Sequence, residues 1–434
     1  MRNYLKSLLF VLLAIAGTAK AQDVELTPLD TIAANVQKLN ADIISLKRLK
    51  VSGYMQAQYQ KIETIGGKTF EGGDFPANSD NRFMLRRARV KFTYDTKLAK
   101  YVFNLDLTEK GAAIKDMYIN VMDPFINAFS VTAGVFNRPF GYEIPYSSSS
   151  RESPERSRFT QTLFPGERES GAMLTFQMPK TSPLNFLKID AGLFNGNGTS
   201  PEFDKKKDFI GHIGIEKTTA NRIIKYGLGA SYYNGSVLHP KQTAAGQTNK
   251  GVNSYEISDG AFVANSDTAA GSFHKRTYMG LDAQLIVETP LGFTTLRGEY
   301  LSGQQPGTAA STSSTTSAPL AGDAYLRKIS GAYVYFVQTF AGTKLGVVAK
   351  WDVYDPNTKI SGDQIGLTTA PAKATTAGDL KYTTTGLGLL YNYTPHVRLT
   401  AYYDMVKNET SKNLSGYNSD LKDNVFTLRL QYKF

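Results

Sequence analysis

The sequence predicts an all-β protein: a 16-stranded antiparallel transmembrane β-barrel preceded by a short N-terminal helix or coiled coil. Three observations lead to this class. Apolar and polar residues alternate in many segments, the connections between these segments are short and long in turn, and aromatic residues make up 12% of a chain with a mean hydropathy of -0.28. Barrel strands expose only alternate residues to lipid and gather aromatic residues at both membrane interfaces, so the sequence is polar on average.

Residues 1–21 resemble a secretory signal peptide. Arg2 and Lys6 precede an apolar run over residues 8–16, and the small-residue segment 19–21 follows it. This is the order of charged region, apolar region and cleavage site in such peptides. A transmembrane helix needs about 20 apolar residues, and this run is shorter. We expect the mature chain to begin directly after residue 21.

Residues 22–50 have the period of a helix. Apolar residues recur three and four positions apart, which predicts a helical segment with a coiled-coil face. The seam consists of Leu29, Ile32, Val36, Leu39, Ile43 and Leu46. One interpretation is a periplasmic coil through which protomers associate. The other is an amphipathic helix that packs on the mouth of the barrel.

Residues 51–434 have the period of strands. Sixteen segments alternate, and we predict a strand for each: 51–62, 82–95, 99–109, 113–122, 128–136, 170–178, 186–194, 208–218, 223–234, 276–289, 292–302, 325–338, 342–354, 381–393, 396–407 and 423–434. The last segment ends on Phe434, with Tyr432 two positions earlier. Such a terminal aromatic resembles the signal that the outer-membrane insertion machinery reads.

The connections favour a membrane barrel over a soluble sandwich or propeller. Those after even-numbered segments are short, whereas most of those after odd-numbered segments are long and rich in Gly, Ser, Thr and Asn. Outer-membrane barrels have tight periplasmic turns and long outer loops. An even strand number also places both ends of the barrel in the periplasm. Sixteen strands leave an aqueous channel, whereas eight are filled by side chains.

Alternation places three cations of one strand on the inner wall. Arg87, Arg89 and Lys91 face opposite to the apolar row that contains Val90 and Phe92. An arginine that faced lipid at mid-membrane would cost about 2–4 kcal/mol, so the basic row must face the lumen. It predicts an anion-attracting wall. The alternative is that these residues form ordinary lumen ion pairs, because inward aspartates occur on neighbouring strands.

The connection 137–169 is predicted to fold into the barrel as a constriction loop. It contains five arginines and five glutamates, so its net charge is balanced. Arginine binds phosphate or carboxylate through a two-pronged fork, but it can equally bind the loop's own glutamates. The candidate anion-binding residues of the loop are Arg138, Arg151, Arg156, Arg158 and Arg168.

Five motifs, in this order and spacing, resemble the phosphate-selective porin O and P family: RRARVKFTYDTKLAKYVFNLDL, AAIKDMYIN, VTAGVFNRPFGYE, ERSRF and PGERESGAMLTF. The resemblance implies a homotrimeric 16-stranded anion channel with a basic inner wall. By position, Arg87, Arg89 and Lys91 match the family's arginine-rich strand and Lys115 matches the lysine of its KDAYI segment. Arg138 stands where a lysine is common, and the equal number of glutamates in the loop leaves open which anion passes.

The expected function is therefore that of an outer-membrane porin of a Gram-negative bacterium, through which small anions diffuse, with phosphate and polyphosphate among the candidates. The alternatives are a non-selective nutrient porin and a structural or adhesive barrel. The chain contains no cysteine, and its four histidines lack the spacing of a catalytic triad or a metal site, so we expect no enzyme and no cofactor. The expected partners are membrane lipid, small anions, the insertion machinery at Phe434 and two further copies of the chain. No nucleic acid is expected.

Overall fold

The computed structural model describes residues 32, 35–40, 43, 47–109, 111–239, 253–265, 272–316, 318–320, 322–367 and 373–434. The chain divides into two units, Met1–Leu49 and Lys50–Phe434. In the first unit, the described residues from Ile32 to Arg48 are helical, and the expected signal peptide lies outside the described residues. No helix in the described part is long and apolar enough to cross a membrane.

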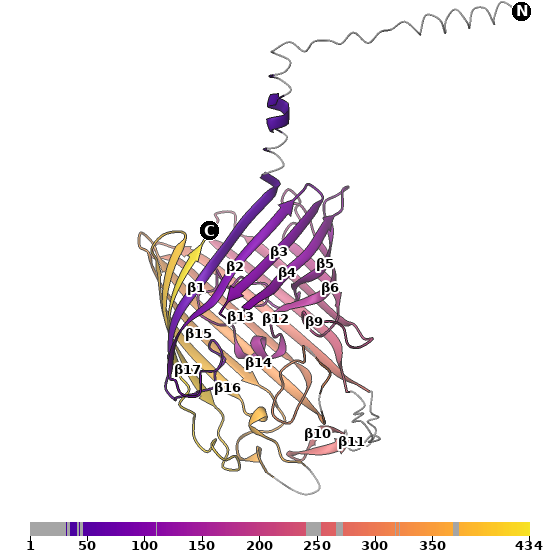
Figure 1. Cartoon of the computed structure of the whole chain (residues 1–434), viewed down its shortest axis with the longest axis vertical. Helices are drawn as coiled ribbons and strands as arrows, with labels where there is room; N and C mark the ends of the chain where they lie inside the picture. The colour runs from indigo at the N-terminus through magenta and orange to yellow at the C-terminus, as the bar shows by residue number, and fades with distance from the viewer. Residues whose placement is uncertain are drawn as a thin grey trace, which may run out of the picture. The chain divides into compact units, whose positions relative to one another are not determined.

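The second unit is a closed antiparallel barrel of sixteen long strands (Figure 1). These strands are β1 (Leu49–Ile62), β2 (Asn81–Asp95), β3 (Ala99–Thr108), β4 (Gly111–Met122), β5 (Phe129–Asn137), β6 (Arg168–Gln177), β7 (Leu187–Phe194), β8 (Asp208–Thr218), β9 (Ile224–Leu238), β12 (Phe273–Thr289), β13 (Gly292–Gly307), β14 (Ala324–Phe340), β15 (Leu345–Asp355), β16 (Tyr382–Asn392), β17 (Val397–Asn408) and β18 (Val425–Lys433).

Each strand pairs with the next, and the barrel closes between its first and last strands. β1 and β18 are antiparallel, from Tyr54 opposite Lys433 to Ile62 opposite Val425. β9 pairs directly with β12. All sixteen predicted strands are present, which confirms the fold prediction. Their ends differ from the prediction by a few residues, because turns and extensions beyond the membrane do not alternate.

One hairpin was not predicted. β10 (Ser254–Ser258) and β11 (Ala261–Asn265) pair with each other inside the long connection between β9 and β12. β10 also runs parallel to the first residues of β14. The sequence predicts a loop here, because five-residue strands are too short to show a clear period.

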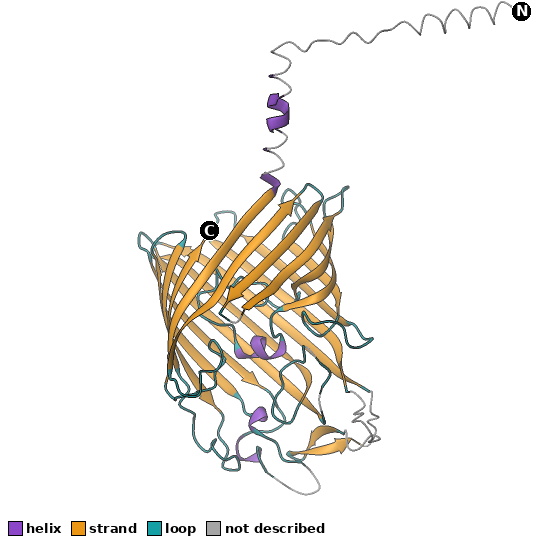
Figure 2. Cartoon of the chain, viewed as in Figure 1, coloured by secondary structure: helices purple, strands orange, loops and turns teal. Residues whose placement is uncertain are grey.

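The strands have an apolar outer face and a polar inner face. In β18, Phe426, Leu428, Leu430 and Tyr432 are exposed on the outside, and the residues between them are buried. Only alternate side chains of a strand share a face, so this pattern follows directly from the sequence. Long loops gather at one end of the barrel (Figure 2).

Candidate functional site

The segment between β5 and β6, residues 138–167, lies inside the barrel, and we call it the inner loop. It includes the short helix α3 (Arg158–Leu163), drawn within the ring of strands in Figure 2. Phe140, Phe159 and Phe164 are buried and belong to one apolar cluster with wall residues of β5, β7–β9 and β12–β17. Phe159 stacks on Tyr333 of β14 with ring centroids 6.1 Å apart. The inner loop is therefore held by a hydrophobic core on this side of the lumen.

Glycines of the wall provide the space for these rings. A Cβ atom on Gly331 of β14 would lie 2.6 Å from side-chain atoms of Phe159, and one on Gly280 of β12 would lie 2.8 Å from Phe140. Real Cβ atoms do not approach neighbours so closely, because protein interiors are already close-packed. The positions of these two glycines in the strands thus match the positions of two phenylalanines in the inner loop.

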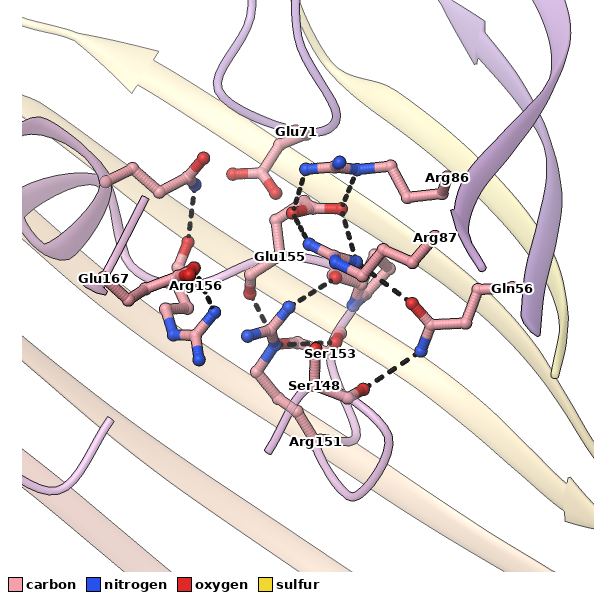
Figure 3. Close-up of polar contacts among 12 residues, drawn as sticks. Gln56, Glu71, Arg86, Arg87, Ser148, Arg151, Ser153, Glu155, Arg156 and Glu167 are labelled. Carbon is pink, nitrogen blue, oxygen red and sulfur yellow. Dashed lines mark hydrogen bonds and ion pairs between the residues drawn. The ribbon is translucent and has the colours of Figure 1, made fainter. Parts of the chain in front are cut away.

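The opposite side of the inner loop is held by charge. Glu155 binds three arginines, with distances of 2.8 Å to Arg86, 2.7 Å to Arg87 and 3.1 Å to Arg429 (Figure 3). Burial opposes ionisation of this carboxyl group, but Arg86, Arg87 and Arg429 hold the pKa of Glu155 well below its ordinary value. The carboxylate is therefore ionised at neutral pH. Arg429 comes from β18, so the cluster joins both ends of the barrel chain to the inner loop.

Arg86 reaches this cluster because β2 contains one extra residue. The inward residues of β1, in order Gln60, Gln58, Gln56 and Tyr54, contact Arg82, Met84, Arg87 and Arg89 of β2. The partners advance by two, then three, then two, which is the pattern of a β-bulge. Strict alternation continued from Val90 would place Arg86 on the lipid side. The bulge brings Arg86 and Arg87 to the same, inner side.

A second bulge lies in β4. Asn104 of β3 is opposite Asp116, but Leu105 is opposite Ile114, so Lys115 has no partner on β3. Ile114 and Met117 are exposed on the outer face. Both residues between them, Lys115 and Asp116, are therefore available to the lumen, and Lys115 interacts electrostatically with Glu167 of the inner loop. The KDAYI-like segment is thus the site of a bulge that alternation does not reveal.

Most of the predicted anion-binding arginines have acidic partners. Arg89 binds Asp106 at 3.0 Å, Arg138 binds Glu169 at 2.5 Å, Arg156 binds Glu167 at 2.5 Å, and Arg168 binds Asp116 at 3.0 Å. All four arginines therefore form lumen ion pairs, which is one of the two interpretations that the sequence leaves open. Arg87 also forms such an ion pair, with Glu155.

The other four predicted residues form no such ion pair with the described residues. Arg151 donates to the carbonyl oxygens of Ser153 and Pro154, and the guanidinium of Arg158 lies 3.8 Å from the ring centroid of Tyr382. Lys91 and Lys115 form no hydrogen bond or ion pair within the ranges that the structure describes. Of the residues that hold the inner loop, Glu155 and Arg86 were missed as site residues. Arg429 was recognisable from alternation.

An open cavity of about 1410 Å³ is lined by β4–β9 and by Arg138, Pro139 and Tyr142 of the inner loop. Its lining includes Lys91, Asn120, Thr132, Asp190 and His212. A smaller cavity of about 230 Å³ shares Lys91 and Asp116 with it. The wall residues of the two cavities come mainly from β1–β9, whereas most wall residues of the apolar cluster come from β12–β17. Phe136 of β5 belongs to both.

No protein-family model matches the sequence, and no curated protein matches it. Solved structures are similar in fold. OmpF of Salmonella typhi, in complex with daunomycin, is 12% identical, with a TM-score of 0.53 over 89% of this chain and 97% of that chain. OprB of Pseudomonas putida is 10% identical, with a TM-score of 0.49 over 92% of this chain and 97% of that chain. The chain has the 16-stranded barrel fold of Gram-negative outer-membrane porins, and the narrower resemblance to the phosphate-selective O and P family stays a prediction.

Proposed function

We propose that this protein is an outer-membrane porin through which small anions diffuse passively, with the inner loop as its constriction. The observation that carries the proposal is the cluster at Glu155, where three guanidinium groups share one carboxylate and two formal positive charges remain (3 − 1 = 2). The four side chains line neither cavity, so this charge acts on a passing anion through the field of the wall, which raises the local anion concentration.

Lys91 and Lys115 support the same preference. Neither forms an ion pair with the described residues, although Lys115 interacts electrostatically with Glu167, and Lys91 lines both cavities. The ammonium group of Lys91 is thus open to solutes, whereas the charges of Arg89, Arg138 and Arg156 are balanced locally. Phosphate and polyphosphate are candidates through the sequence resemblance. Because the inner loop also contains glutamates, small monovalent anions are equally good candidates.

The test is the reversal potential of single channels in a KCl gradient, wild type against Lys91→Glu. Because Lys91 has no ion pair, the substitution changes the charge of the lumen without releasing the inner loop. Lys97→Glu, in the short turn between β2 and β3, changes the net charge by the same amount away from the cavities and is the control. We expect anion preference in the wild type and in Lys97→Glu, and a clear loss in Lys91→Glu. Cation preference in the wild type would refute the proposal.

Phosphate is tested in the same bilayers. Phosphate added to chloride solutions should reduce the chloride current if the lumen binds it, and leave the current unchanged if the pore is a general anion channel. A membrane that stays silent at high protein input would favour the structural or adhesive barrel instead.

We further propose that protomers associate as homotrimers through the N-terminal helix. Ile32, Val36, Leu39 and Ile43 belong to the predicted seam, lie in helical residues and are all exposed, by 39–60%. An apolar helix face in water is a surface that a second copy can cover. Val36→Asp/Leu39→Asp should weaken the oligomer on unheated gels and leave the heat-modifiable barrel intact. An oligomer of unchanged stability would favour the interpretation as a helix packed on the barrel mouth.

A further inference from the structure

The outer face of the barrel has a charged arc and an uncharged arc. Four lysines lie in outward-facing rows near the extracellular ends of their strands: Lys61 of β1, Lys275 of β12, Lys328 of β14 and Lys407 of β17, all exposed. These strands belong to one continuous series that runs from β12 through β18 to β1. The outward rows of β2–β7, strands that the structure describes throughout, contain no charged side chain.

The four lysines lie at a similar level of the barrel. Lys61 is two residues beyond the outward Tyr59, and Lys407 is four residues beyond Tyr403. Lys328 is four residues before Ala332, which is opposite the outward Tyr300. Lys275 is four residues before Met279, which is opposite the outward Tyr232. Tyrosines concentrate at the level of the lipid headgroups. The ammonium groups therefore lie at or just above the headgroups of the outer leaflet.

The residues that the structure describes provide no counter-charge for these lysines. None of the four forms an ion pair with the described residues, and the one hydrogen bond, from Lys328 Nζ to Gln304 Oε1 at 2.9 Å, goes to a neutral group. Asp355 at the end of β15 also faces outward, but its carboxylate accepts the backbone N–H of Asn357 at 3.0 Å. A positive row without acidic partners, directly above an apolar surface, matches an anion fixed at the membrane surface.

We propose that the arc from β12 to β1 binds phosphorylated headgroups of outer-leaflet lipids through Lys61, Lys275, Lys328 and Lys407. Long basic side chains extend along an apolar surface and place their charge at the interface, where a lysine is tolerated far better than at mid-membrane. Each basic group near a surface of anionic lipids adds to the attraction. The uncharged arc β2–β7 takes no part in this contact.

The experiment uses the full chain in maltoside micelles, with phosphatidic acid as the probe and phosphatidylcholine as the neutral lipid. The measurement is the midpoint of thermal unfolding, since a ligand that binds only the folded state raises it. The test variant replaces Lys61, Lys275, Lys328 and Lys407 by Gln. The control replaces four exposed loop lysines by Gln and removes the same charge: Lys68, Lys205, Lys359 and Lys422.

We expect phosphatidic acid to raise the midpoint of the wild type and of the loop control by several degrees, and to have at most a small effect on the test variant. Heat-modifiability without lipid shows that each variant is folded before the comparison. Equal shifts in all three proteins would mean that overall charge is responsible, and no shift in the wild type would mean that no such contact exists. An equal rise with inorganic phosphate would assign the site to a soluble ion. Each of these three outcomes rejects the proposal.

Discussion

Gly331 of β14 packs directly against the ring of Phe159 in the inner loop. The space beside Gly331 is occupied by the Phe159 side chain, to which a new Cβ atom would come within 2.6 Å. Phe159 has no exposed surface. The docked position of the inner loop therefore depends on the absence of a side chain on a wall strand 172 positions later in the sequence (331 − 159 = 172).

Gly331→Ala should loosen the inner loop. The added methyl group forces Phe159 from its position, and overpacking of this kind typically costs about 1–3 kcal/mol. We expect a lower unfolding midpoint and larger, noisier single-channel conductance. Gly227→Ala on β9 is the matched control, because its Cβ atom would meet nothing closer than 3.4 Å. Equal conductance in the two variants would show that the inner loop does not limit the current.

Glu155→Gln should increase anion preference and reduce stability together. Gln keeps the size of the side chain but leaves Arg86, Arg87 and Arg429 without their shared carboxylate, so the local charge rises. Removal of one partner of a buried ion pair typically costs about 3–5 kcal/mol. Reversal potentials and thermal unfolding measure the two effects. Glu202→Gln, in the exposed loop between β7 and β8, removes the same charge from the surface and should change neither.

Deletion of Lys115 should leave a regular strand. Without this residue, Ile114 stays outside and Asp116 stays inside, and the register with β3 continues unbroken. We therefore expect a folded barrel with weaker anion preference. Lys115→Gln, which keeps the bulge and removes the charge, should show a similar loss of preference. A deletion variant that does not fold would mean that the bulge is needed for barrel closure, and the Gln variant then still tests the charge.

Glu71, in the connection between β1 and β2, should make stability depend on pH. Burial raises the pKa of Glu71 from 4.5 to about 7. The folded protein therefore holds this proton more tightly than the unfolded chain, and stability falls as the pH rises from about 4.5 to about 7. Thermal unfolding across this range should show the decline in the wild type and a smaller one in Glu71→Gln.

Glu155 gives stability the opposite dependence on pH, and it does so at a lower pH. Its pKa is lowered, so its contribution to stability is complete above the ordinary pKa of 4.5 and is lost as the pH falls below that value. An unchanged decline between pH 4.5 and 7 in Glu71→Gln would assign the effect to other groups. Asp423, whose pKa burial raises to about 6, is then the next residue to replace.

The strands were predictable because their information is local. In β18, every second residue from Phe426 to Tyr432 is apolar, and lipid on one side and water on the other allow only one orientation of such a strand. The same reasoning places Arg87, Arg89 and Lys91 on the inner wall. Both the sixteen strands and the alternation of short and long connections follow from residues that are neighbours in the sequence.

The partners of the inward charges were decided only by the tertiary structure. Alternation shows that Arg87 faces the lumen, but its contact with Glu155 depends on where the inner loop docks, and this in turn depends on Gly280 and Gly331 of distant strands. The bulges that turn Arg86 inward and leave Lys115 without a partner are single-residue irregularities. They depend on the pairing between strands, and a period read along one strand contains no information about its neighbour.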